Sequence, residues 1–304
     1  MTPPPIATVT GPPASLKAAS TNGASVNPMP DLSAKRDHAC RLIRDLGRVA
    51  VAFSGGVDST LVLALAVETL GAANVLAVTG RSSSLAAAED ADARALAARI
   101  GVEHVYLDTR EFDDPNYLAN PTNRCYYCKT ELYTRMGPTL ATRGFTTIVN
   151  GTNADDLGDH RPGLIAAAEH AVRSPLAEAG LTKAEVRDLS RALGLPTAEK
   201  PAAPCLSSRV QYGEAITPKK LRMIERAETV LRDLGFGECR VRHHDKLARI
   251  EVPAARIGEI AAPSIRERLD TSLREIGYAY VTVDLRGFRS GSLNEVIAFG
   301  PRQA

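Results

Sequence analysis

One stretch of six residues combines glycines, serines and an aspartate directly before a predicted helix. The string Ser54-Gly-Gly-Val-Asp-Ser59 follows an apolar run, Val49 to Phe53, and precedes a helical run that continues to Leu70. Glycines let backbone N–H groups turn inward, the helix start adds partial positive charge, and serines add hydroxyl donors. The string differs from a Walker loop in lacking the Gly-Lys-Ser/Thr ending. A loop that grips the β- and γ-phosphates as a unit suits cleavage of ATP between the α- and β-phosphates. The candidate ATP-binding residues are Ser54, Gly55, Gly56, Asp58 and Ser59.

A second polar string follows a later predicted strand, Thr146 to Asn150. It reads Asn150-Gly-Thr-Asn-Ala-Asp-Asp156. In open α/β sheets ligands bind at the carboxyl ends of strands, near a point where the strand order reverses. Mg²⁺ prefers one or two carboxylates together with phosphate oxygens, so this string is a candidate site for Mg²⁺ with ATP. The candidate residues are Gly151, Thr152, Asn153 and Asp155; the alternative is a solvated turn.

Three of the five cysteines have spacings that suggest chemistry. Cys125 and Cys128 form a Cys-x-x-Cys in a stretch, Asp113 to Lys129, that we expect to be irregular, and Cys205 follows a Pro/Ala-rich linker. Thiolates bind iron–sulfur clusters and zinc, and a structural zinc ion is bound by four protein ligands. Three thiolates would leave one iron of a [4Fe–4S] cluster open, so all three cysteines are candidate catalytic and metal-ligating residues. The alternatives are a redox pair or buried thiols that happen to be close in sequence.

The elements that must position these residues alternate between strands and helices. Strands are predicted over 48–53, 74–78, 104–107 and 146–150, with helices between them, which indicates a parallel, doubly wound α/β sheet. Thr182, with Glu185 three residues later, predicts a capping box at the start of a further helix. Beyond the linker the pattern restarts with a helix over 218–234 and strand pairs over 240–244 with 248–252 and 278–285 with 294–299. We therefore expect a disordered extension over 1–30, a nucleotide domain over 31–203 and a smaller α/β domain over 204–304.

Basic side chains in the second domain are candidates for holding an anionic substrate. Arg209 lies close to Cys205 in sequence, and Arg240 and Arg242 share one face of a predicted strand. The alternative for the strand pair is a solvated face. Glu225 and Glu228 lie on one side of the helix over 218–234, where they could hold a metal or pair with Arg226 and Arg232; we favour pairing.

Composition limits the classes of partner and compartment. The formal net charge is +2 over 304 residues, which gives no overall attraction to nucleic acid. No apolar run is long enough to span a membrane, and the N-terminus lacks the pattern of a secretory signal. We therefore expect a cytoplasmic protein with reduced cysteines, in which Cys40 and Cys239 serve packing. The apolar faces of the small second domain suggest a homo-oligomer.

Taken together, these strings resemble a known family. The phosphate loop resembles the PP-loop superfamily, whose fold is that of the adenine nucleotide alpha hydrolases. Further strings resemble the LarE family of ATP-dependent sulfur transferases from about Asp31 to the end: Asn123-Arg-Cys-Tyr-Tyr-Cys-Lys129, Asn150 to Asp156, Asp159-His-Arg-Pro-Gly163, Arg173-Ser-Pro-Leu176 and Lys200-Pro-Ala-Ala-Pro-Cys-Leu-Ser-Ser-Arg209.

The resemblance implies a particular reaction. ATP adenylates one carboxylate of a pyridinium-3,5-dicarboxylate mononucleotide, and sulfur converts it to a thiocarboxylate during synthesis of the nickel-pincer cofactor of lactate racemase. Some members sacrifice one cysteine, at a position that Cys205 resembles. Others hold a [4Fe–4S] cluster on three cysteines, and Cys125, Cys128 and Cys205 resemble that second kind. The resemblance does not indicate the external sulfur source.

Three other functions use some of the same residues. A PP-loop tRNA thiolase would also combine an ATP loop with cysteines, but it would need a basic surface or an added RNA-binding domain. An ammonia-dependent, amide-forming synthetase would use the ATP loop and leave the Cys-x-x-Cys without a role. An iron–sulfur sensor would leave the intact phosphate loop unused.

Overall fold

The computed structural model describes residues 30–158, 161–289 and 291–294. The chain divides into two compact units. The first unit comprises the described residues up to 82 together with 87–110 and 125–203, and the second comprises 83–86, 111–124 and the described residues from 204 onward. The expected N-terminal extension lies outside the described residues except for its last residue, Pro30.

The first unit contains a four-stranded sheet in which every strand pair is parallel. The strand order is β3-β2-β1-β4, so the chain leaves β1 in one direction and returns to its other side with β4. This confirms the predicted doubly wound parallel sheet and puts the reversal of strand order between β1 and β4. The strands are β1 (Val49–Ala52), β2 (Val75–Arg81), β3 (Glu103–Asp108) and β4 (Thr147–Val149).

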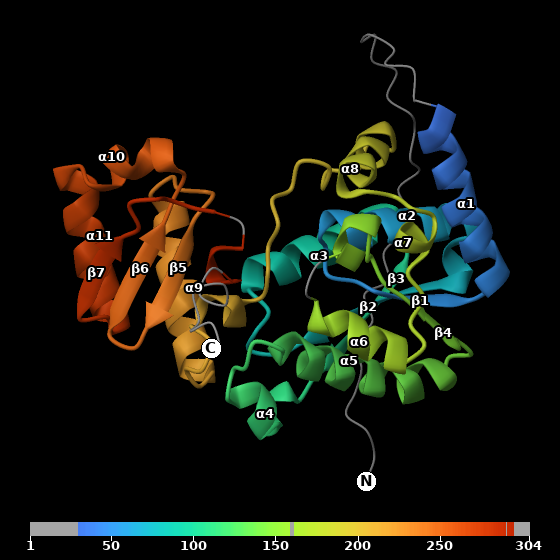
Figure 1. Ribbon diagram of the computed structural model, residues 1–304, viewed down its shortest axis with the longest axis horizontal. Helices are drawn as coiled ribbons and strands as arrows, with labels where there is room; N and C mark the ends of the chain where they lie inside the picture. Colours follow the sequence, from blue (N-terminus) through green and yellow to red (C-terminus); the bar gives the residue numbers. More distant parts are fainter. Residues whose placement is uncertain (1–29, 159–160, 290, 295–304) are drawn as a thin grey trace, which may run out of the picture. The chain divides into compact units, whose positions relative to one another are not determined.

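Helices cover both faces of this sheet (Figure 1). One face packs against α1 (Pro30–Leu46), α2 (Val57–Leu70), α3 (Ala87–Ile100), α7 (Pro175–Glu178) and α8 (Lys183–Ala192). The other packs against α5 (Arg124–Ala141) and α6 (Pro162–Glu169). Burial on both faces explains why β1 reads as a continuous apolar run and does not alternate. Within the described chain, no helix is both long and apolar enough to cross a membrane.

The second unit contains a three-stranded mixed sheet, which confirms a second, smaller α/β unit. Strand β5 (Arg240–His244) pairs antiparallel with β6 (Leu247–Glu251), which pairs parallel with β7 (Tyr280–Val283). Its core also takes side chains from α9 (Pro218–Asp233), α10 (Ile257–Ile260) and α11 (Pro263–Ile276). Buried Cys239 belongs to this core, as expected of a packing residue. The unit also contains α4 (Pro115–Leu118) and the short 3-10 helix Leu206–Arg209.

Two sequence predictions need correction or lie outside the described chain. The stretch 113–129 is not irregular, because it contains α4 and the start of α5. Its first proline occupies the first position of α4, where a missing N–H costs nothing, and Asp114 caps that helix by accepting from the Asn116 N–H at 2.8 Å. The Cys-x-x-Cys is therefore helical. The last predicted strand, 294–299, lies outside the described residues beyond Asn294.

Candidate active site

The phosphate-loop string connects β1 directly to α2. The Ser54 and Ser59 hydroxyl oxygens lie 3.1 Å apart, and the Gly56 N–H donates to the Ser54 hydroxyl at 3.4 Å. Gly55 has φ +69°, a left-handed conformation that glycine adopts without strain, and a Cβ there would meet Ala93 of α3 at 3.2 Å. No side chain caps the start of α2 at Gly56. The string therefore forms a narrow loop whose serines and helix start can meet an anion.

The second polar string packs against this loop. A Cβ on Gly151 would lie 2.6 Å from the Ser59 backbone nitrogen and 2.8 Å from the Asp58 carbonyl carbon. The Asn153 side-chain amide donates to Asp58 Oδ1 at 3.0 Å. Only a residue without a side chain allows this approach, so the two strings form one surface at the point where the strand order reverses.

Lys183 joins this surface, although it was not among the predicted site residues. Its ammonium contacts Asp58 Oδ2 at 2.5 Å, and its backbone N–H donates to Asp155 Oδ2 at 2.8 Å. The capping box of Thr182 and Glu185, predicted from sequence, fixes the start of α8 directly before it. A positive charge in the first turn of a helix is unfavourable, because the helix dipole is positive at that end. This position of Lys183 was the signal in the sequence that its ammonium has a partner outside the helix.

Lys200, the first residue of the string Lys200 to Arg209, contacts the phosphate loop. Its ammonium contacts Glu89 at 2.7 Å and Asp92 at 2.8 Å on α3, and donates to the Gly55 carbonyl at 3.3 Å. Burial disfavours the charged form, but the hydrogen bonds with Asp92 and Glu89 outweigh it and raise the pKa of Lys200. Arg187 of α8 donates to the Lys200 carbonyl at 3.0 Å. The segment that leads toward Cys205 is therefore held at its start.

A buried histidine supports the strand that leads into the loop. The Thr79 hydroxyl donates to the Phe53 carbonyl at 2.8 Å, so its oxygen accepts from His104 Nε2 at 2.8 Å. Burial lowers the pKa of His104 to about 4. His104 is therefore neutral near pH 7 and carries its proton on Nε2.

The predicted cysteines fall in both units. Cys125 and Cys128 lie one turn apart at the start of α5, where residues three apart share a face; Cys125 is exposed and Cys128 half-buried. Cys205 is exposed and directly precedes the 3-10 helix Leu206–Arg209 of the second unit. Arg124, the residue before Cys125, donates to the Ser207 carbonyl at 3.0 Å. Among the described residues, no group of three or more His, Cys, Asp or Glu side chains is arranged to hold a metal ion.

Arg209 forms a buried ion pair with Glu228. Its Nε lies 2.9 Å from Glu228 Oε1, and its Nη1 donates to the Pro204 and Cys205 carbonyls, to the latter at 3.1 Å. The prediction that Glu228 pairs with an arginine of its own helix is confirmed by Arg232 at 3.8 Å, and its closer partner is Arg209 from the Cys205 loop. A buried carboxylate needs a hydrogen-bonded cation, and Arg209 supplies it.

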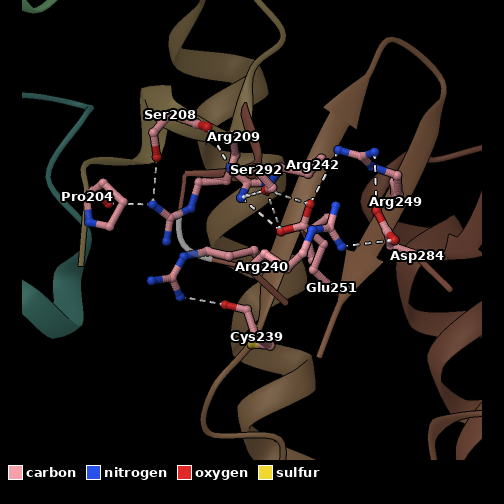
Figure 2. Close-up of polar contacts among 12 residues, drawn as sticks. Pro204, Ser208, Arg209, Cys239, Arg240, Arg242, Arg249, Glu251, Asp284 and Ser292 are labelled. Carbon is pink, nitrogen blue, oxygen red and sulfur yellow. Dashed lines mark hydrogen bonds and ion pairs between the residues drawn. The ribbon is translucent and has the colours of Figure 1, made fainter. Parts of the chain in front are cut away.

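The two predicted strand arginines differ in their surroundings (Figure 2). Arg242 is buried and contacts Glu251 and Ser292, each at 2.8 Å. Arg240 is half-buried, donates to the Cys239 carbonyl at 2.7 Å, and lies 5.1 Å from the ring centre of Phe288. Burial and the charge of neighbouring Arg209 lower the pKa of Arg240. Arg240 is therefore the most accessible of the three predicted substrate-binding arginines, since Arg209 and Arg242 are both buried.

Comparisons with known proteins agree with this site. Residues 44–116, which include the phosphate loop, match the NAD synthase family. The chain is 46% identical over 266 residues to an uncharacterized protein of Synechocystis, covering 88% of this chain and 99% of that protein. It is 39% identical over 270 residues to the pyridinium-3,5-bisthiocarboxylic acid mononucleotide synthase of Lactiplantibacillus plantarum, covering 88% of this chain and 97% of that synthase.

A shorter match is confined to part of the chain. This chain is 46% identical over 70 residues to the tRNA-specific 2-thiouridylase MnmA of Rhizorhabdus wittichii. The match covers 20% of this chain and 18% of that enzyme. The match to the synthase, in contrast, spans both units. The ATP loop and the near full-length match together show that the chain belongs to the LarE family of ATP-dependent sulfur-transferring enzymes.

Proposed function

We propose that this enzyme adenylates a carboxylate of pyridinium-3,5-dicarboxylate mononucleotide and converts it to a thiocarboxylate for a nickel-pincer cofactor. The observation that carries the proposal is the surface shared by the phosphate loop, Gly151, Asn153 and Lys183, in a chain 39% identical to a synthase of the bisthiocarboxylic acid mononucleotide. A carboxylate is a poor acyl donor, and an adenylate gives it a good leaving group.

In the first step a substrate carboxylate oxygen attacks the α-phosphorus of ATP, and the bond from that phosphorus to the bridging oxygen breaks. We assign the leaving pyrophosphate to the phosphate loop, whose serines and helix start favour an anion. Asp58 and Asp155 both contact Lys183 and provide the one or two carboxylates that Mg²⁺ prefers beside phosphate oxygens. Lys183 then neutralises the charge that develops on the pyrophosphate.

We assign the sulfur site to Cys125, Cys128 and Cys205. The donors fit an iron–sulfur cluster in kind, because two thiols share one helical turn and the third is an exposed thiol. When bound, a [4Fe–4S] cluster with one open iron supplies a sulfide for transfer as AMP leaves the acyl carbon.

Arginines of the second unit are proposed to bind the mononucleotide. Arg240 is half-buried beside Arg209 and Arg242, both buried in ion pairs with carboxylates. We assign Arg240 to direct contact with a substrate phosphate or carboxylate. Arg209 and Arg242 then orient the Cys205 loop and the strand, and add positive potential.

The test measures iron, acid-labile sulfide and the UV–visible spectrum of anaerobically purified protein, together with AMP and thiocarboxylate formed from the mononucleotide and ATP. About four irons per chain, lost in Cys125→Ala, Cys128→Ala and Cys205→Ala, are expected for three thiolate ligands. If the protein were active without iron and only Cys205 were needed, the sulfur would come from a sacrificed Cys205 and not from a cluster. Turnover of tRNA in place of the mononucleotide would refute the proposed substrate.

We further propose a cytoplasmic homo-oligomer that is reloaded by an external sulfur source. Tyr280 and Leu285, in and just after β7, expose 64% and 86% of their surface, which is unusual for large apolar side chains on a sheet edge. Light scattering of the wild type and of Leu285→Glu tests this. A monomeric wild type would refute it.

A further inference from the structure

The Lys200 ammonium contacts the phosphate loop with all of its N–H donors engaged. An ammonium group carries three donors. They meet the Gly55 carbonyl oxygen at 3.3 Å, a Glu89 carboxylate oxygen at 2.7 Å and an Asp92 carboxylate oxygen at 2.8 Å. These residues all belong to the first unit. Because these partners use every donor of the ammonium, none remains for a phosphate, and any effect of Lys200 on a bound phosphate acts through the loop itself.

The contacted carbonyl belongs to the peptide unit that joins Gly55 to Gly56. In a trans peptide unit the C=O and the N–H point in opposite directions. The Gly55 carbonyl points toward Lys200, so the Gly56 N–H points to the other side, where it donates to the Ser54 hydroxyl at 3.4 Å. That hydroxyl lies 3.1 Å from the Ser59 hydroxyl. The Gly56 N–H therefore points toward the two serines that we assign to pyrophosphate.

Glycine on both sides lets this peptide unit adopt either of two orientations. Gly55 has φ +69° and Gly56 has φ −79°, and neither carries a Cβ that would block rotation about the bonds beside the peptide unit. A flipped unit would turn the N–H away from a bound anion and present the Gly55 carbonyl oxygen to it, which is unfavourable. The Lys200 ammonium favours the observed orientation, because its contact with the carbonyl is lost in the other.

Two carboxylates of α3 hold the ammonium at this carbonyl. A Cβ on Gly55 would meet Ala93 at 3.2 Å, so α3 packs against the loop beside Lys200. The Lys200 side chain is 16% exposed. Burial disfavours its charged form, but the hydrogen bonds with Asp92 and Glu89 outweigh burial and raise the pKa of Lys200. The ammonium is therefore charged near pH 7 and fixed in place by partners on both sides.

We propose that Lys200 is a positioning residue for adenylation, whose ammonium keeps the Gly56 N–H directed at the β- and γ-phosphates of ATP and then at the leaving pyrophosphate. This role rests on the proposed assignment of pyrophosphate to the phosphate loop and names a further residue that the assignment requires. A donor that already points at the anion needs no reorganisation when charge develops on the bridging oxygen.

Isothermal titration calorimetry of the full-length protein measures the affinity for magnesium pyrophosphate and, separately, for AMP. In Lys200→Met the affinity for pyrophosphate should fall about tenfold, as expected for the loss of one hydrogen bond to a charged group. The affinity for AMP should stay within about twofold, since AMP carries no β- or γ-phosphate. The Glu89 and Asp92 side chains are 25% and 56% exposed, so water can solvate their charges and the variant should fold.

Two controls separate positioning from charge and from the loss of a cation in general. The double variant Lys200→Met/Asp92→Asn has the net charge of the wild type but lacks the contact with the Gly55 carbonyl, so its pyrophosphate affinity should stay about tenfold lower. Arg143→Met removes a cation of similar exposure, 24% against 16%, from its pair with Glu103. Glu103 begins β3 and so lies at the opposite edge of the sheet from the loop, and both affinities should be unchanged.

The outcomes distinguish this role from the proposed function. Wild-type affinity of Lys200→Met for pyrophosphate, an equal loss of AMP affinity, or recovery in the double variant would overturn the role of Lys200. A wild type that does not bind pyrophosphate would overturn it as well. A selective loss of pyrophosphate affinity, in a protein that forms no adenylate with the mononucleotide, would leave the role of Lys200 standing and refute the proposed substrate.

Discussion

The close approach of Gly151 to the phosphate loop gives the sharpest prediction, for Gly151→Ala. The added Cβ would lie 2.6 Å from the Ser59 nitrogen, 2.8 Å from the Asp58 carbonyl carbon and 2.9 Å from the Ser59 α-carbon. All three are backbone atoms, so no side-chain rotation relieves the contact. Ordinary contacts begin at 3.4 Å, so the shortest one requires the loop and the β4 string to separate by 0.8 Å.

The size of that shift sets the expected effect. Overpacking of this kind costs about 1–3 kcal/mol of unfolding free energy. The effect on catalysis should be larger, because a displacement of ~1 Å at groups that align reactants costs ~10²-fold in rate. We therefore expect the variant to fold and to catalyse substrate-dependent exchange of pyrophosphate into ATP about 10²-fold more slowly. The exchange reports adenylation alone and does not require sulfur transfer.

Gly258→Ala is the matched control. Gly258 lies inside α10, and apart from its chain neighbours and its own helix backbone no atom of the described residues lies within 4 Å of where its Cβ would be. The same substitution there should raise the unfolding free energy by about 0.5–1 kcal/mol and leave exchange unchanged. If Gly151→Ala exchanged pyrophosphate within about twofold of the wild type, the argument that this contact aligns the loop would be refuted.

Three further predictions concern charged or buried groups. Lys183→Met removes the ammonium from Asp58 and should lower kcat about 10²-fold with little change in stability, because the pair is partly exposed. Arg209→Met leaves Glu228 buried without its main partner and should cost about 3–5 kcal/mol in urea unfolding. The pKa of His104 is lowered to about 4, so the unfolded chain binds its proton first and stability is lost as pH falls from about 6.5 toward 4. His104→Gln should lessen that loss in thermal unfolding between pH 7 and pH 5.

Each of these has a control and a contradicting result. Lys219→Met, an exposed lysine on α9, should leave kcat unchanged, and an equal effect of both lysine variants would contradict the role of Lys183. Adding Glu228→Gln to Arg209→Met should recover part of the stability, because the unpaired charge is removed. No recovery would show that the loss is one of packing. An unchanged pH dependence in His104→Gln would show that other groups titrate.

Much of the fold was predictable because its signals are local. Apolar strands alternating with helices indicated the parallel sheet, and Thr182 with Glu185 marked the start of α8 correctly. The stretch 113–129 contains two prolines, which are local signals of turns and loops, and the sequence therefore predicted irregular structure around the Cys-x-x-Cys. The structure shows that Pro115 begins a short helix and that Asn120 completes the turn before α5. Such turns depend on partners far along the chain, which a local pattern does not contain.

The sequence by itself determined the ATP loop and a family resemblance that the near full-length match bears out, and it suggested cysteines for the sulfur chemistry. Only the tertiary structure decided which charges meet. Lys183 reaches Asp58 across 125 residues, and Arg209 of the Cys205 loop joins Glu228 of α9. The phosphate loop and the Cys-x-x-Cys are formed by residues close together in the sequence, so the sequence alone reveals them. Buried charges instead select partners by packing, because an unpaired charge is costly inside a protein, and which partner lies within reach is set only when the chain folds.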